Sequence, residues 1–150
     1  MIFLTTADLD ALLRTELRTL IADEVQLDTI EAEAISEMST YIRGRYDAAA
    51  LFALRAPEPP REGEEPQPQP DPRPRVIVMY LTDLVIYHLY AALNPRQLPD
   101  LRRDRYDQAI RWLERVSNGK LAPDLPAYAS EENISVQNRF GSNRRSSNYW

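Results

Sequence analysis

His88 is the side chain best suited to catalysis by its chemistry, because it is the only histidine and the chain has no cysteine. A catalytic histidine needs a carboxylate that orients it and a nucleophile nearby. Asp83 lies five residues before His88, and this spacing is poor for two side chains on one helix face. We therefore predict that His88 is a buried, hydrogen-bonded core residue and not a catalytic one.

Other catalytic and cofactor sites also lack their usual residues. A zinc site needs several converging cysteines or histidines, and a phosphate-binding loop needs closely spaced glycines, of which the whole chain has four. The carboxylate pairs Asp23–Glu24 and Glu64–Glu65 are typical of solvated faces and not of a glycosidase acid pair. We predict no catalytic, cofactor-binding or metal-binding residues and no enzyme activity.

The charge is distributed unevenly along the 150 residues, whose net charge is −5. Residues 1–50 hold ten acids and four bases, whereas residues 133–150 hold three arginines and no acid. An overall acidic chain is not expected to bind nucleic acid over its whole surface. An acidic body with a basic end indicates two surfaces with different partners. The start of the chain lacks the pattern of a secretory signal.

Prolines mark the main boundary in the chain. Eight of the twelve lie between Pro57 and Pro74. Because proline fixes φ and removes the amide donor, we expect residues 56–74 to be an extended, solvated loop resembling polyproline II.

Before this loop, two amphipathic helices are expected. Thr6 should cap the first, with Asp8 in its first turn, and its leucines then recur at helical spacing up to Ile21. Asp28 and Glu31 have the spacing of a capping box that would open the second helix. Its acidic residues Glu31, Glu33 and Glu37 should point away from an apolar stripe. That stripe comprises Ile30, Ala34, Met38, Tyr41 and Ile42.

After the loop, Pro74 suits the first position of a third helix. The segment 76–93 is apolar on nearly every face, but Asp83 and His88 argue against a membrane span. We expect it to be the central helix of a bundle, with its surface covered either within the bundle or by another subunit. A fourth helix should start near Pro99–Asp100 and end at Asn118–Gly119. Its expected apolar face comprises Leu101, Tyr106, Ala109, Ile110, Leu113 and Val116.

The predicted fold is therefore all-α, a small bundle of four helices (up to five) with a Pro-rich loop insertion. We predict a helical domain over residues 1–126 and an extended C-terminal tail over residues 127–150, which is too polar to form a core of its own. Aromatic and arginine residues alternate in the tail, and these types anchor interfaces. The predicted partner-binding residues are Arg139, Phe140, Arg144, Arg145, Tyr149 and Trp150.

Four segments resemble, in order, a family of small proteins common in Mu-like phages and prophages. They are TTADLDALL (Thr5–Leu13), YIRGRY (Tyr41–Tyr46), TDLVIYHLY (Thr82–Tyr90) and RYDQAIRWLERVSNGK (Arg105–Lys120). Such proteins are similar to head–tail connector adaptors, also called head-completion proteins. The Pro-rich insertion and the FGSNRRSSNYW ending depart from the usual pattern.

The resemblance implies a structural virion protein that forms a ring, commonly of twelve copies, beneath the portal. Its implied partners are the portal protein, neighbouring copies of itself and a downstream neck or tail protein, with DNA passing through the lumen without sequence-specific binding. The implied location is the neck of the virion, after assembly in the host cytoplasm, and no membrane is involved. Two alternatives stay open: a stopper or terminator protein, which tends to be β-rich, or a helical nucleic-acid-binding module that uses the basic tail.

Overall fold

The computed structural model describes residues 1–10, 24–57, 69–93, 96 and 98–128. These residues form five α-helices and no strand: α1 (Thr6–Asp10), α3 (Glu24–Ile42), α4 (Ala48–Ala53), α5 (Arg75–Leu93) and α6 (Asp100–Ser117). The predicted all-α fold is confirmed.

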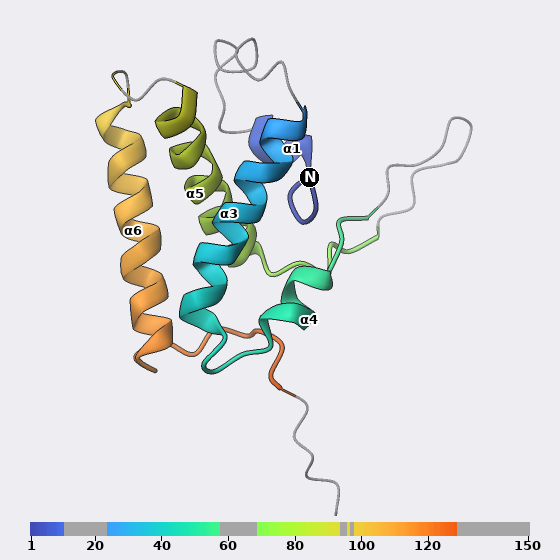
Figure 1. Cartoon of the computed structure of the whole chain (residues 1–150). Helices are drawn as coiled ribbons and strands as arrows, with labels where there is room; N and C mark the ends of the chain where they lie inside the picture. The colour runs from blue at the N-terminus through green and yellow to red at the C-terminus, as the bar shows by residue number, and fades with distance from the viewer. Residues whose placement is uncertain (11–23, 58–68, 94–95, 97, 129–150) are drawn as a thin grey trace, which may run out of the picture.

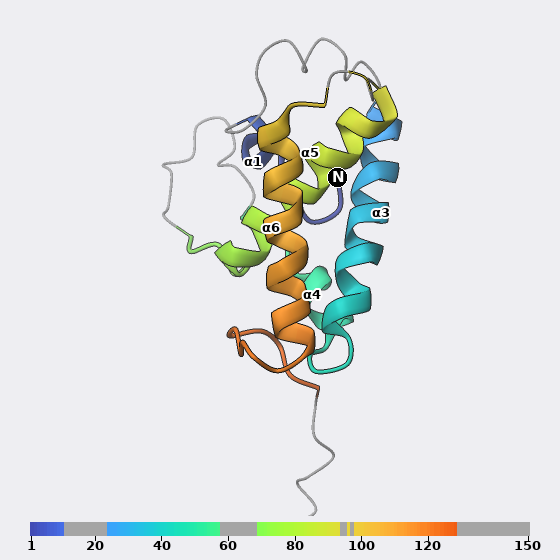
Figure 2. The same cartoon turned by 90° about the vertical axis from the view of Figure 1, so that its left-hand side faces the viewer.

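The three long helices α3, α5 and α6 lie side by side, with α5 antiparallel to the other two (Figures 1 and 2). Each of the three packs against both of the others. The short helix α1 contacts α5, and α4 contacts α3 close to the end of the bundle where α3 and α6 finish (Figure 1). This arrangement makes one hydrophobic core that all five helices enclose.

Helix α5 is the core helix that its apolar sequence predicts. All of its residues from Leu81 to Ile86 are buried. By length and composition α5 could also cross a membrane, but half of that candidate span is buried by the rest of the chain. Of the large apolar side chains that the structure describes in α5, only Met79 is exposed. The apolar surface of α5 is therefore covered mainly within the bundle.

The carboxylate of Glu31 holds the N-terminal segment against α3. Its Oε1 atom accepts hydrogen bonds from the main-chain N–H groups of Phe3 at 2.9 Å and Leu4 at 2.6 Å, and its Oε2 atom accepts one from Ile2. Glu31 is fully buried, so these three bonds compensate a desolvation that would otherwise be unfavourable. They seat Phe3 and Leu4 in the core.

Asp28 and Glu31 do not form the capping box that their spacing predicts. Both lie inside α3, where the backbone amides are already bonded within the helix. The prediction that Glu31 points away from the core is also wrong, because it shares the buried face of Ala34 and Met38. Glu33 does face solvent, as predicted.

Helix α1 is capped by Thr5, one residue earlier than predicted. Asp8 Oδ2 accepts hydrogen bonds from Thr5 N at 2.9 Å and Thr5 Oγ1 at 2.8 Å, and Thr5 Oγ1 accepts one from Asp8 N at 3.2 Å. This reciprocal pattern is a capping box with aspartate as its second member. Thr6 is the first residue inside the helix, and Asp8 lies in the first turn as predicted. The part of the first helix expected over 11–21 lies outside the described residues.

Arg73 anchors the C-terminal end of the Pro-rich segment in the body. Its guanidinium donates to both carboxylate oxygens of Asp71, to Asp8 Oδ2 at 2.9 Å and to the main-chain oxygen of Phe3 at 2.6 Å. Arg73 is buried, so the prediction of a solvated loop is wrong at this end. Hydrogen bonds to several acceptors stabilise the buried guanidinium of Arg73, although the composition of this segment predicts exposure to solvent. Residues 58–68 of the loop lie outside the described residues.

This cluster shifts the pKa values of its members. Hydrogen bonds from Arg73 hold the pKa of Asp71 below its ordinary value. Burial alone would raise the pKa of Asp8, but its hydrogen bonds with Thr5 and Arg73 outweigh burial and lower it. The hydrogen bond to Asp71 in turn raises the pKa of Arg73. Both carboxylates therefore stay ionised, and paired with Arg73, down to a lower pH than free aspartates.

The sequence pattern does not indicate α4, although the predicted bundle has room for a fifth helix. Asp47 caps it, since Asp47 Oδ1 accepts a hydrogen bond from Ala50 N at 2.9 Å. Phe52 packs edge-on against Phe3, with ring centroids 5.3 Å apart. Six residues are too few for a helical period to be recognised in the sequence.

Helix α6 ends at Asn118–Gly119 as predicted. The Asn118 N–H donates to the Glu114 carbonyl at 2.9 Å, and Gly119 has φ 70°, a conformation that favours glycine. The guanidinium of Arg45 lies beside Gly119, so that any Cβ atom there would come within 2.7 Å of it. Leu101, predicted on the apolar face, is instead 62% exposed, because the first turn of α6 lies at the end of the bundle.

Candidate functional site

The predicted partner-binding residues all lie beyond the part of the chain that the structure describes, which ends at Tyr128. They are Arg139, Phe140, Arg144, Arg145, Tyr149 and Trp150. The structure neither brings them together nor separates them. A candidate site among the described residues must therefore be built from side chains that the sequence did not select.

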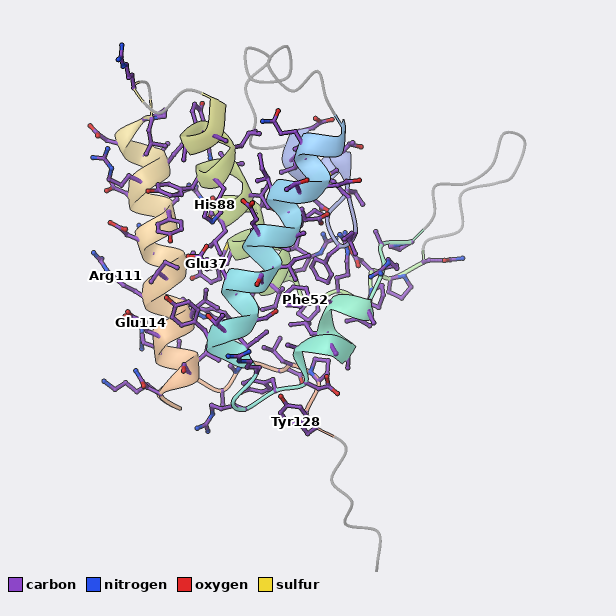
Figure 3. All side chains as sticks on the ribbon, viewed as in Figure 1. Glu37, Phe52, His88, Arg111, Glu114 and Tyr128 are labelled. Carbon is purple, nitrogen blue, oxygen red and sulfur yellow. The ribbon has the colours of Figure 1, made fainter. Side chains whose placement is uncertain are left out.

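A polar cluster joins the three long helices near the middle of the bundle. Glu37 of α3 accepts a hydrogen bond from the Tyr106 hydroxyl of α6 at 2.6 Å, through Oε1. The second oxygen, Oε2, lies 2.7 Å from Nε2 of His88 in α5. Glu37 and His88 lie next to each other between the helices (Figure 3). One carboxylate thus connects all three helices.

His88 differs from its predicted environment in one respect. It is hydrogen-bonded, as predicted, but its side chain is 27% exposed and that of Glu37 is 25% exposed. The orienting carboxylate that Asp83 could not provide comes from a different helix, at a separation of 51 residues. Glu37 was predicted to point away from the apolar stripe of its helix, but it bonds to His88 and Tyr106 and so faces the two helices on which that stripe packs.

The cluster keeps the phenol of Tyr106 protonated. Burial, followed by the hydrogen bond to Glu37, raises the pKa of Tyr106 far above its ordinary value. A phenol held in this state donates to Glu37 but is a poor general base. Within the described residues, no three His, Asp or Glu side chains gather in a group that could hold a metal ion. The contacts of the cluster are those of a junction that fixes the register of three helices.

Two aromatic stacks extend this junction along the interface between α5 and α6. Tyr87 stacks on Tyr106 with ring centroids 4.0 Å apart, and Tyr80 stacks on Trp112 with centroids 4.8 Å apart. Each of these four rings is partly exposed. Stacked pairs contribute about 0.5–1.5 kcal/mol beyond the area they bury, so they help to set the angle between the two helices.

Asp83 is a buried carboxylate between the two stacks. Its Oδ2 atom lies 3.6 Å from Nη1 of Arg105, which is too far for a hydrogen bond, and its side chain is 4% exposed. Oδ1 has no hydrogen-bond partner among the described residues. Burial raises the pKa of Asp83, and the nearby Arg105 and Arg102 offset part of this rise.

The sequence indicates the burial of Glu31, but it does not indicate the distant contacts of Glu37 and Arg73. Glu31 falls on the same helical period as Ala34 and Met38, so its burial could have been read from the spacing. Glu37 bonds to residues 51 and 69 positions away, and Arg73 bonds to Phe3 and Asp8 at 70 and 65 positions in addition to its neighbour Asp71. No local pattern indicates the distant contacts.

One family model matches the chain, and its description is Bacteriophage Mu, Gp36. The match covers residues 62–141, just over half of the chain. It includes α5, α6 and two of the four segments that carry the resemblance, at Thr82–Tyr90 and Arg105–Lys120. No curated protein and no solved structure matches the chain significantly.

The predicted relation to Mu-like phage proteins is confirmed by this match, which spans the core helix α5 and its main partner α6. The chain belongs to the Bacteriophage Mu Gp36 family and is a phage protein.

Proposed function

We propose that this phage protein is a head–tail connector adaptor. In this role it is a structural virion protein that forms a ring between the portal and the neck or tail and extends the DNA channel. The observation that carries the proposal is that the chain belongs to the Mu Gp36 family. The described residues form only helices and the connections between them, which agrees with this role.

The proposed partners are the portal protein, neighbouring copies of this chain (commonly twelve) and a downstream neck or tail protein. A cyclic ring uses a heterologous interface, so one face of each subunit meets a different face of the next. DNA would pass through the lumen without sequence-specific contacts. The proposed location is the neck of the virion, after assembly in the host cytoplasm, with no membrane contact and no enzyme activity.

The secondary structure supports this proposal over a stopper or terminator protein. Stopper and terminator proteins tend to be β-rich, whereas the residues that the structure describes contain no strand. The coverage of α5 within the chain further suggests that ring contacts use the outer faces of the bundle, and not the apolar core helix.

Electron microscopy of purified portal protein mixed with this chain tests the proposal. We expect an additional ring of density on the narrow end of the portal that is absent from images of the portal alone. A portal that remains bare at saturating concentrations of folded protein would contradict the adaptor role.

A further inference from the structure

The end of the bundle from which the chain continues toward residues 129–150 carries an organised surface. The turn after α3 and the segment after α6 are tied together there, because Asp47 N donates to the Pro126 carbonyl at 2.8 Å. The hydroxyl of Tyr128 donates to the main-chain carbonyl of Arg43, and the Arg45 guanidinium lies beside Gly119. Figure 1 shows both segments at the same end as α4.

Basic side chains collect on this surface. We call it the basic end and define it by five exposed residues: Arg43, Arg45, Arg115, Lys120 and Tyr128. None of its four bases forms an ion pair with another described residue. Tyr128 is 53% exposed although its hydroxyl is fixed to the backbone, so its ring is held at the surface in a defined position. In a chain of net charge −5, this is a local excess of positive charge.

We propose that the basic end docks onto an acidic surface of a protein partner. The inference rests on the proposed function, in which that partner is the portal protein. Tyrosine and arginine are the residue types that most often anchor protein interfaces. A tyrosine ring already held in place loses little conformational freedom on binding, which favours its use as an anchor.

A protein surface fits the basic end better than a nucleic acid does. The exposed carboxylates of Glu114 and Asp124 are close in sequence to Arg115 and Lys120. A phosphate backbone, which carries only negative charge, would be repelled by these two acids, whereas a mainly acidic protein surface can place bases of its own opposite them. Nucleic-acid affinity grows with the number of phosphates that bases neutralise, and a mixed surface with four bases neutralises few. Mixed charge with an aromatic anchor is ordinary at protein interfaces.

The test compares two full-length variants with the same change of charge. Arg43→Glu/Lys120→Glu reverses two bases of the basic end, and Arg96→Glu/Arg103→Glu reverses two exposed bases near the opposite end of α6. The probes are the purified portal protein of the same phage and a short duplex DNA. Affinities are measured by biolayer interferometry at low and at physiological salt, and melting curves confirm that both variants are folded.

We expect the basic-end variant to lose about tenfold or more in portal affinity and the control variant to stay within about twofold of wild type. Wild-type binding should also weaken as salt increases. Equal portal binding by wild type and the basic-end variant would overturn the docking surface and leave the adaptor role intact. Absence of wild-type portal binding would overturn the adaptor role and this partner with it. A preference for DNA that only the basic-end variant loses would assign the surface to nucleic acid instead.

Discussion

Arg105 of α6 lies 3.6 Å from one carboxylate oxygen of Asp83 in α5, without a hydrogen bond between them. The other oxygen of Asp83 has no hydrogen-bond partner among the residues that the structure describes. Because burial raises the pKa of Asp83, the charged form is disfavoured in the folded protein. Because its pKa is raised in the folded state, the contribution of Asp83 to stability is greatest below the ordinary aspartate pKa and declines as the pH rises through the raised pKa.

Asp83→Asn should therefore stabilise the protein at neutral pH, by about 1 kcal/mol in the free energy of unfolding. The difference from wild type should shrink as the pH falls through the raised pKa of Asp83, because the wild-type carboxyl then takes up its proton. Urea unfolding at several pH values measures this, and Asp107→Asn on the exposed side of α6 is the control. Destabilisation by Asp83→Asn at neutral pH would mean that the ion pair with Arg105 outweighs burial.

The Arg73 cluster predicts the opposite dependence on pH. Asp71 and Asp8 have lowered pKa values, so their stabilisation is present above the ordinary aspartate pKa and is lost as the pH falls through the lowered values. Asp71→Asn should reduce the free energy of unfolding at pH 7 by about 1–3 kcal/mol. This deficit should disappear in strong acid.

Unfolding curves between neutral pH and strong acid measure this difference, with Asp124→Asn, at an exposed position, as the control. A deficit of the same size at every pH would show that Asp71 acts through packing and not through its charge.

The buried carboxylate of Glu31 makes a further prediction. Glu31→Gln keeps the size of the side chain but replaces one acceptor oxygen with an NH₂ group, which cannot accept from Ile2, Phe3 or Leu4. We expect a loss of about 1–3 kcal/mol in the free energy of unfolding. Glu33→Gln, on the exposed side of the same helix, should change it by less than about 0.5 kcal/mol. Similar losses for both variants would contradict the role of Glu31 in holding the N-terminal segment.

The hydroxyl and the ring of Tyr106 should contribute separately. Tyr106→Phe removes the hydrogen bond to Glu37 and keeps the stack on Tyr87, so we expect a loss of about 1 kcal/mol. Tyr106→Ala removes both and should cost about 2–4 kcal/mol. Thermal and urea unfolding of the two variants compare these values, and equal losses would mean that the stack contributes nothing.

Removal of residues 129–150 tests the predicted tail. Because Tyr128 is bonded to Arg43 and is retained, the helical far-UV circular dichroism spectrum and the melting temperature should stay close to wild type. Portal binding should drop, since the predicted anchors from Arg139 to Trp150 are lost. Unchanged portal binding would refute the role of the tail and leave docking to the basic end alone.

Several features of this protein followed from the sequence because they depend on neighbours along the chain. The apolar run after Pro74 gave the core helix α5, and Asn118–Gly119 marked the end of α6. Proline density marked the long connection between α4 and α5. Four ordered segments indicated the phage family that the match to residues 62–141 confirms.

Only the tertiary structure decided which distant partners the polar side chains have. Arg73 bonds to Phe3 across 70 residues, and Glu37 bonds to His88 and Tyr106 across 51 and 69. Glutamate and arginine are usually placed in solvent when a sequence is interpreted, because their burial is unfavourable without a partner. The partners here come from other helices, so the balance between desolvation and hydrogen bonding is fixed only when the helices pack together.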